Sequence, residues 1–195
     1  MSGLGVAKDG SAVFLDRDGV LLEHVRYLRR TDDVELIPAA TAAVRALNQA
    51  GVAAVVVTNQ SVVARGMCSE GELEEIHAVM RRKLQPARLA GVYYCPHLPP
   101  GPGEAARPPY RVECDCRKPS PGLLERASTE LGIDLARSLM IGDSTSDVEA
   151  GRRAGAATAL VRTGVAGRDA RYDGAEHVFG DVGEAIRWWL AQRPK

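Results

Sequence analysis

Residues 12–20 read AVFLDRDGV, an apolar run of strand length that ends in two carboxylates one residue apart and then a glycine. On an extended chain, a spacing of two places the side chains of Asp16 and Asp18 on the same side. Gly19 allows the sharp turn that carries the backbone away. The alternative is a strand that leads into an ordinary Asp/Gly turn, so the meaning of the pair depends on the rest of the chain.

Further apolar runs of strand length alternate with helical patterns, which is typical of a mostly parallel sheet with helices on both faces. These runs carry little polar alternation, as expected of buried strands. The predicted fold class is therefore α/β, a doubly wound, Rossmann-like sheet. We predict strands at 12–15, 53–57, 91–94, 138–141 and 157–161, and helices at about 38–50, 69–89, 121–131, 145–154 and 182–192.

The composition fits one well-cored domain. The 195 residues are 45% hydrophobic and 26% charged, so we expect a single domain over 1–195 with a tail at 1–10. Lys plus Arg and Asp plus Glu both number 25, and a net charge of zero argues against nucleic acid or an anionic membrane as a partner. The first 25 residues lack an export pattern, and no apolar stretch approaches the roughly 18 residues of a membrane span. We therefore expect a cytoplasmic protein whose cysteines are free thiols or metal ligands.

Four clusters of polar side chains adjoin the predicted elements, three after strands and one before a helix. Ligands of an open parallel sheet bind beyond the carboxyl ends of its strands, so these clusters should converge. Each has an ordinary alternative when taken alone, such as a polar turn, a solvated basic pair or a helix cap. Together they predict a hard-cation site that faces a phosphate pocket. The clusters are Asp16 with Asp18, Thr58 with Asn59, Gln60 and Ser61, Arg117 with Lys118, and Asp143 with Asp147.

Cysteine and histidine mark the two ends of a long irregular segment, rich in Pro and Gly, within 95–117. Cys95, His97, Cys114 and Cys116 supply three thiols and one imidazole, a tetrahedral set suited to zinc. Four ligands leave no open position, so the predicted metal is structural and staples the loop. A disulfide from Cys95 to Cys114 or Cys116 is the alternative.

These residues and their order resemble the haloacid dehalogenase superfamily, whose signatures are D-x-D-G, a Thr or Ser after a strand, a Lys, and G-D-x-x-x-D. The resemblance covers nearly the whole chain. It implies a phosphatase in which Asp16 is the nucleophile that forms an aspartyl-phosphate and Asp18 is the acid and base. It also implies that Thr58 and Lys118 hold the transferring phosphoryl group. Magnesium is implied at Asp16, the backbone carbonyl of Asp18 and Asp143, with Asp147 in support.

The cysteine loop narrows this resemblance. Cys-Pro-His with Cys-Asp-Cys-Arg-Lys-Pro, joined to Thr-Asn-Gln-Ser and Ala64-Arg65-Gly66, is similar to the D-glycero-D-manno-heptose-1,7-bisphosphate 7-phosphatases. Histidinol-phosphate phosphatases, or phosphatases of another small sugar phosphate, are the alternative, but the histidinol enzymes typically join these ligands by a shorter loop. The resemblance implies removal of the 7-phosphate, with the second phosphate held by Arg117. The other implied substrate contacts are His24, Tyr27, Asn59, Gln60, Ser61 and Arg65.

Three positions depart from the family pattern. Leu22 replaces a customary Asn, Val62 replaces a Gly, and Ser144 stands where Lys is usual. The last change removes a positive charge beside the phosphate, so either Arg65 or another group compensates or the substrate differs. The resemblance further implies a capless monomer that acts on a small phosphorylated sugar. A zinc-stapled binding module without catalysis is the remaining alternative, and the zero net charge and strand-end carboxylates speak against it.

Overall fold

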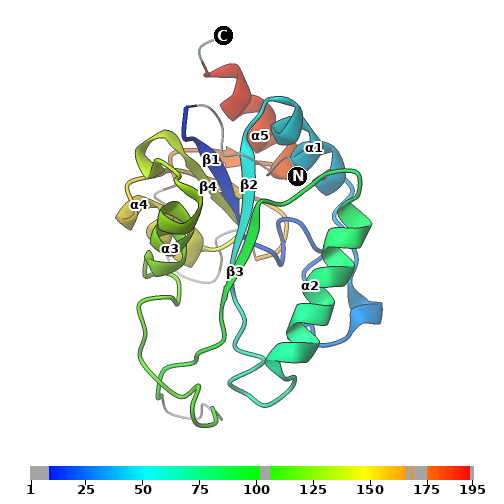
Figure 1. The fold of residues 1–195 in the computed structure, drawn as a ribbon, viewed down its shortest axis with the longest axis vertical. Helices are drawn as coiled ribbons and strands as arrows, with labels where there is room; N and C mark the ends of the chain where they lie inside the picture. Colours follow the sequence, from blue (N-terminus) through cyan, green and yellow to red (C-terminus); the bar gives the residue numbers. More distant parts are fainter. Residues whose placement is uncertain (1–8, 102–105, 166–167, 169–174, 194–195) are drawn as a thin grey trace.

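The computed structural model describes residues 9–101, 106–165, 168 and 175–193, so most of the predicted tail at 1–10 and part of the loop at 95–117 lie outside the described residues. Six parallel strands form one sheet in the order β3-β2-β1-β4-β5-β6. This confirms the predicted α/β class. Figure 1 labels β1 to β4 of this sheet. The strands are β1 (Ala12–Leu15), β2 (Ala53–Asn59), β3 (Gly91–Cys95), β4 (Leu139–Gly142), β5 (Ala157–Val161) and β6 (Val178–Phe179).

Helices cover both faces of the sheet because successive residues of each buried strand point to opposite sides. Helices α1 (Ala40–Gln49), α2 (Glu70–Leu84) and α5 (Val182–Ala191) pack on one face. Helices α3 (Gly122–Leu131) and α4 (Thr145–Arg153) pack on the other. In β1, Val13 and Leu15 belong to the first core and Ala12 and Phe14 to the second, and all four are fully buried. The doubly wound arrangement follows from this alternation.

Several predicted boundaries were wrong. Helix α2 ends at Leu84 rather than near residue 89, because Gln85 precedes a proline and is extended at ψ 140°. Strand β2 continues through Thr58 and Asn59, which therefore belong to the strand end and not to the loop after it. The two-residue strand β6 and the 3-10 helices at Thr31–Asp33 and Leu135–Arg137 were not predicted, since they are too short to carry a periodic signal.

The register of the central strands brings the expected site residues to one edge. Leu15 lies beside Val56 of β2 and Ile141 of β4, and the Asp16 amide donates to the Ile141 carbonyl at 3.0 Å. In the described parts of the chain, only a 3-10 turn and α1 separate β1 from β2, and only α2 separates β2 from β3, so no cap domain is inserted there. No described helix is both long and apolar enough to cross a membrane.

Candidate active site

A buried lysine joins two carboxylates at the carboxyl end of the sheet. The Lys118 ammonium lies 2.9 Å from Asp16 Oδ1 and 2.5 Å from Asp147 Oδ1, and it donates to the Val57 carbonyl at 2.8 Å. Its side chain is 2% exposed and that of Asp16 is 13% exposed. Burial alone would lower the pKa of Lys118, but the carboxylates of Asp147 and Asp16 raise it further than burial lowers it. Lys118 is therefore a permanent cation beside Asp16.

The carboxyl groups near Lys118 lie close together and are largely buried. Burial raises the pKa of Asp143 to about 8, with the Asp16 carboxylate adding to the effect. Burial also raises the pKa of Asp16 to about 6, partly opposed by Lys118 and reinforced by Asp147 and Asp18. Oxygen atoms of Asp16, Asp143 and Asp147 lie within 4.8 Å of one another and could hold a metal ion. Hard carboxylate oxygens that repel each other in this way fit a divalent cation such as Mg²⁺.

Asp147 has other partners that limit its part in such a site. Its Oδ2 accepts from the Ser144 amide at 3.0 Å and from the Ser144 hydroxyl at 2.6 Å, which caps α4. Its Oδ1 faces Lys118. Asp147 is thus engaged in holding Lys118 and the helix start, whereas Asp16 and Asp143 have carboxylate oxygens available to a cation.

The turn after β5, to which sequence analysis assigned no role, packs against Asp143. The Val165 amide donates to Asp143 Oδ2 at 2.7 Å, and the Thr163 hydroxyl donates to the Gly19 carbonyl. Gly164 has φ +65°, and a Cβ there would lie 1.9 Å from Asp143 Oδ2 and 2.8 Å from the Gly19 Cα. Only glycine fits between these chains. The sole signal in the sequence was polar and glycine residues after the strand at 157–161.

Asp18 is held by an arginine to which sequence reasoning assigned no role. Arg17 is fully buried and forms a two-point contact with Asp18, from Nε to Oδ1 at 3.1 Å and from Nη2 to Oδ2 at 2.9 Å. The Gln60 amide donates to Asp18 Oδ2 at 3.0 Å and to Thr58 Oγ1 at 2.9 Å. Asp18 and Thr58 therefore share one hydrogen-bond network.

Asn59 is likewise occupied by the protein itself. Its side-chain oxygen accepts from the Lys118 amide and its nitrogen donates to the Lys118 carbonyl, both at 3.0 Å. This reciprocal pair fixes the backbone from which the Lys118 side chain extends. The structure thus brings Asn59 and Gln60 to the site as supports for other side chains, and Gln60 is only 3% exposed.

A hollow of about 220 Å³ opens beside Asp18, lined by residues 24–28 and 59–62. His24 is exposed on its rim and Ser61 is half-buried within it. Tyr27 has φ +59°, a conformation uncommon for residues other than glycine. Its ring lies 5.2 Å from the Arg26 guanidinium and 5.1 Å from that of Arg65. The pocket therefore joins Tyr27 and the cation of Arg26 to the Asp18 carboxylate, and Arg65 lies beside the Tyr27 ring.

The three departures from the family pattern have structural reasons. Leu22 and Val62 are buried, at 0% and 3% exposure, and pack in apolar clusters where an Asn or Gly would leave a gap or an unpaired polar group. The Ser144 hydroxyl is bound to Asp147 and contacts Ser146 at 2.8 Å. Ser144 thus supplies a helix cap at this position and no charge.

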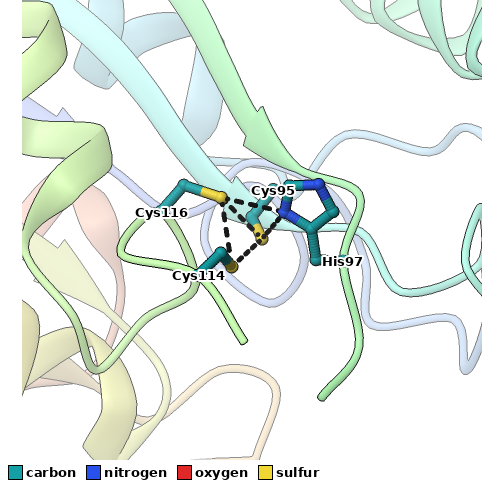
Figure 2. A group of neighbouring side chains, drawn as sticks. All are labelled: Cys95, His97, Cys114 and Cys116. Atoms are coloured by element: carbon teal, nitrogen blue, oxygen red, sulfur yellow. Dashed lines mark hydrogen bonds between the residues drawn. The ribbon is translucent and has the colours of Figure 1, made fainter. Parts of the chain in front are cut away.

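The predicted metal ligands of the irregular loop meet in one cluster, as Figure 2 shows. The sulfur of Cys116 lies 3.0 Å from that of Cys95 and 3.3 Å from that of Cys114, and Cys95 and Cys114 are 3.6 Å apart. His97 Nδ1 is 3.3 Å from the Cys116 sulfur. These distances exclude a disulfide, whose sulfurs are about 2.05 Å apart. Three thiol sulfurs and one imidazole nitrogen that lie within 4.8 Å of one another are a donor set that fits Zn²⁺.

The cysteine and histidine cluster is connected through its neighbours in sequence to the segment that carries Lys118. Arg117 is half-buried and its Nη1 donates to the His97 carbonyl at 3.1 Å. The Gly122 amide at the start of α3 donates to the Asp115 carbonyl at 3.1 Å. The loop that carries Cys114 and Cys116 is therefore connected to the residues on both sides of Lys118.

Comparison with known proteins agrees with this geometry. A family model for HAD-hydrolase-like proteins matches residues 115–185. The D-glycero-beta-D-manno-heptose-1,7-bisphosphate 7-phosphatase of Haemophilus ducreyi is 43% identical over 80% of this chain and 85% of its own length. The Escherichia coli K12 protein of the same name is 43% identical over 82% of this chain and 83% of its own length. The crystal structure of D,D-heptose 1,7-bisphosphate phosphatase from B. bronchiseptica, complexed with magnesium and phosphate, superposes with a TM-score of 0.80 at 30% identity and covers 94% of this chain and 99% of its own.

Proposed function

Because this chain belongs to the haloacid dehalogenase-like phosphatases, within the family of D-glycero-D-manno-heptose-1,7-bisphosphate 7-phosphatases, we propose that it removes the 7-phosphate of that sugar bisphosphate. The observation that carries the proposal is the meeting of Asp16, Lys118 and Asp143 at the end of β1, beside a pocket. The curated relatives are named for the β anomer, so that anomer is the first substrate to test.

The reaction proceeds in two displacements. The Asp16 carboxylate attacks phosphorus, the bond to the sugar oxygen breaks, and Asp18 gives its proton to the departing oxygen. Asp18 then takes a proton from a water molecule. That water attacks the phosphorus of the aspartyl-phosphate and releases inorganic phosphate and the Asp16 carboxylate. The buried location of Asp16, next to the permanent cation of Lys118, supports its role as the nucleophile.

Charge compensation is the main requirement of this reaction, since a carboxylate must approach an anionic phosphate. Lys118 offsets part of the charge, and the Thr58 hydroxyl donates to a phosphoryl oxygen. Asp16, the Asp18 backbone carbonyl and Asp143 would hold Mg²⁺, which when bound screens the phosphate and polarises its oxygens. Asp147 holds Lys118 in place.

The sugar lies in the pocket at 24–28 and 59–62. His24, Tyr27, Ser61 and Arg65 contact it, and Arg117 binds the second phosphate. Arg65 and Arg26, both beside Tyr27, supply the positive charge that Ser144 does not. The zinc cluster of Cys95, His97, Cys114 and Cys116 is structural. We also propose that the protein is a single-domain monomer of the cytoplasm without nucleic-acid or membrane partners, which the free cysteines and zero net charge support.

The test is a substrate panel with Mg²⁺ that contains both heptose 1,7-bisphosphate anomers and histidinol phosphate, with wild type and Asp16→Asn compared. We expect the heptose bisphosphate to be the best substrate by kcat/KM. The Asn variant nearly preserves shape but lacks the nucleophile, so its activity should fall at least about a thousandfold. Activity confined to histidinol phosphate would reject the substrate, and an active Asn variant would reject the mechanism.

A further inference from the structure

Arg17 is fully buried, and its guanidinium contacts Asp18, Gln60 and His77. Nε and Nη2 donate to the two oxygens of Asp18. Nη2 also donates to Gln60 Oε1 at 2.9 Å, and Nη1 lies 3.3 Å from His77 Nε2. A buried guanidinium can only donate, so each of these partners must act as an acceptor. This requirement fixes the orientation of the Gln60 amide and the tautomer of His77.

The orientation of Gln60 decides what Thr58 can do. With Oε1 turned to Arg17, the amide nitrogen must donate to Asp18 Oδ2 and to Thr58 Oγ1, as observed. The Thr58 oxygen is then already an acceptor. Its own hydroxyl proton is left to donate to a ligand, which is the role that a phosphoryl oxygen requires.

The neutral tautomer of His77 is set in the same way. Nε2 accepts from Arg17, so the proton lies on Nδ1, which faces the Glu74 carboxylate at 3.8 Å. His77 belongs to α2 and is 1% exposed. It therefore completes the acceptors around Arg17 from a different element of the fold.

We propose that Arg17, Gln60 and His77 are positioning residues that hold Asp18 in the orientation for proton transfer and Thr58 in the orientation for phosphate binding. The inference rests on the proposed function. A network that served stability alone could be replaced by apolar side chains at little cost, and its bonds need not converge on two residues of the reaction. Here the hydrogen bonds of the Gln60 side-chain amide join it to Arg17, Asp18 and Thr58.

The test compares weakly basic leaving groups with the strongly basic alkoxide of the sugar. Nitrophenolate, and acetate from acetyl phosphate, depart without a proton, whereas the sugar alkoxide needs one from Asp18. A misoriented Asp18 therefore slows the sugar phosphate more than the activated phosphate. The quantity to measure is kcat/KM, which reports transfer to Asp16 even when hydrolysis of the aspartyl-phosphate limits kcat.

Three variants and one control separate the roles. His77→Leu removes the acceptor for Arg17, and His77→Gln restores one, since a Gln oxygen can occupy the position of Nε2. Gln60→Met removes the donor to both Asp18 and Thr58. Met80→Ala, one turn along α2 in the apolar core, destabilises the same helix without touching the network.

We expect His77→Leu to lose about 10- to 100-fold more kcat/KM on the heptose bisphosphate than on the activated phosphate, and His77→Gln to stay within a few fold of wild type. Gln60→Met should show the same difference in kcat/KM between the two substrates. It should also lower kcat/KM on both, because Thr58 is no longer held in the orientation for phosphate binding. Met80→Ala should lower the melting temperature and leave the ratio of the two substrates unchanged.

Equal losses on both substrates in His77→Leu, or a leaving-group effect in Met80→Ala, would overturn the inference. If His77→Leu does not fold, the difference expected for Gln60→Met decides the question in its place. Failure of the proposed function looks different, because the wild-type enzyme would then be inactive on the heptose bisphosphate.

Discussion

At the scale of single residues, neighbours in the sequence have different surroundings. Asp16 and Asp18 follow the end of β1 at Leu15 and lie at the site, while Arg17 between them is fully buried and binds Asp18. Asn59 and Gln60 were predicted to contact substrate, yet their amides bind Lys118, Asp18 and Thr58 in the structure. Their contact with the sugar stays a prediction, and their role as supports is the one that their hydrogen bonds indicate.

His77 makes the stability of the protein sensitive to acid. Burial, with the nearby charge of Arg17, lowers the pKa of His77 to about 3, against 6.5 for an unperturbed histidine. Below pH 6.5 the unfolded chain binds a proton that the folded protein does not, so stability is lost as the pH falls from 6.5 toward 3. This costs about 2 kcal/mol near pH 5.

Denaturant unfolding of wild type and His77→Gln at several pH values measures this contribution. The difference in free energy of unfolding between the two proteins should shift in favour of the variant as the pH falls, because glutamine does not titrate. A difference that stays constant from pH 7 to pH 5 would show that His77 is not held neutral.

At the scale of elements, two loops after the strands complete the site. The cysteine cluster orders the segment before α3, and Lys118 follows Cys116 by two residues. The turn after β5 packs Gly164 against Asp143 and Gly19. Neither loop has a regular pattern in the sequence, and both act by close contact rather than by secondary structure.

Zinc should bind at about one ion per chain, and Cys116→Ser should abolish it. Loss of the metal frees the loop and with it the backbone of Lys118, so we expect a lower melting temperature and a fall in kcat of about 10- to 100-fold. Cys68→Ser is the matched control, since Cys68 lies outside the cluster. Elemental analysis and thermal unfolding check both proteins, and a Cys116→Ser protein that retains zinc would contradict the assignment.

Gly164→Ala should weaken the affinity for Mg²⁺, because the new Cβ would lie 1.9 Å from Asp143 Oδ2. Gly155→Ala is a matched control, since Gly155 has φ +78° but no atom within 4 Å of the position that a Cβ would occupy. Both variants carry the strain of a left-handed alanine, about 1 kcal/mol. The Mg²⁺ concentration for half-maximal activity should rise in Gly164→Ala alone, and equal values in the two variants would refute the contact.

At the scale of the whole molecule, the parallel sheet gathers the ends of β1, β2 and β4 at one edge, and other contacts join segments near the two ends of the chain. Arg193 Nη1 donates to the Ser11 hydroxyl at 2.6 Å and Nη2 to Asp9 Oδ2 at 2.5 Å, with the guanidinium 4.8 Å from the Trp189 ring. These contacts connect the entry to β1 with the end of α5.

Arg193→Ala should lower the free energy of unfolding by about 1 kcal/mol, because it removes a charged hydrogen bond and the ring contact. Catalytic rates should not change, since no site residue contacts Arg193 in the described structure. Arg187→Ala, an exposed position on the same helix, serves as the control. Unfolding curves that coincide for the two variants would show that the contact between the chain ends adds no stability.

The α/β class, the four polar clusters and the cysteine set could all be predicted from the amino-acid sequence, because strand and helix periods and strand-end chemistry are local properties. The packing of the folded chain was needed to show that Arg17 is a buried partner of both Asp18 and His77. It was also needed to show that Asn59 binds Lys118, that Gln60 binds Asp18, and that Gly164 packs against Asp143. All of these contacts except that between the neighbours Arg17 and Asp18 join residues that are distant in the chain. Whether a polar side chain meets a substrate or a neighbouring element depends on what packs against it, which no local pattern records.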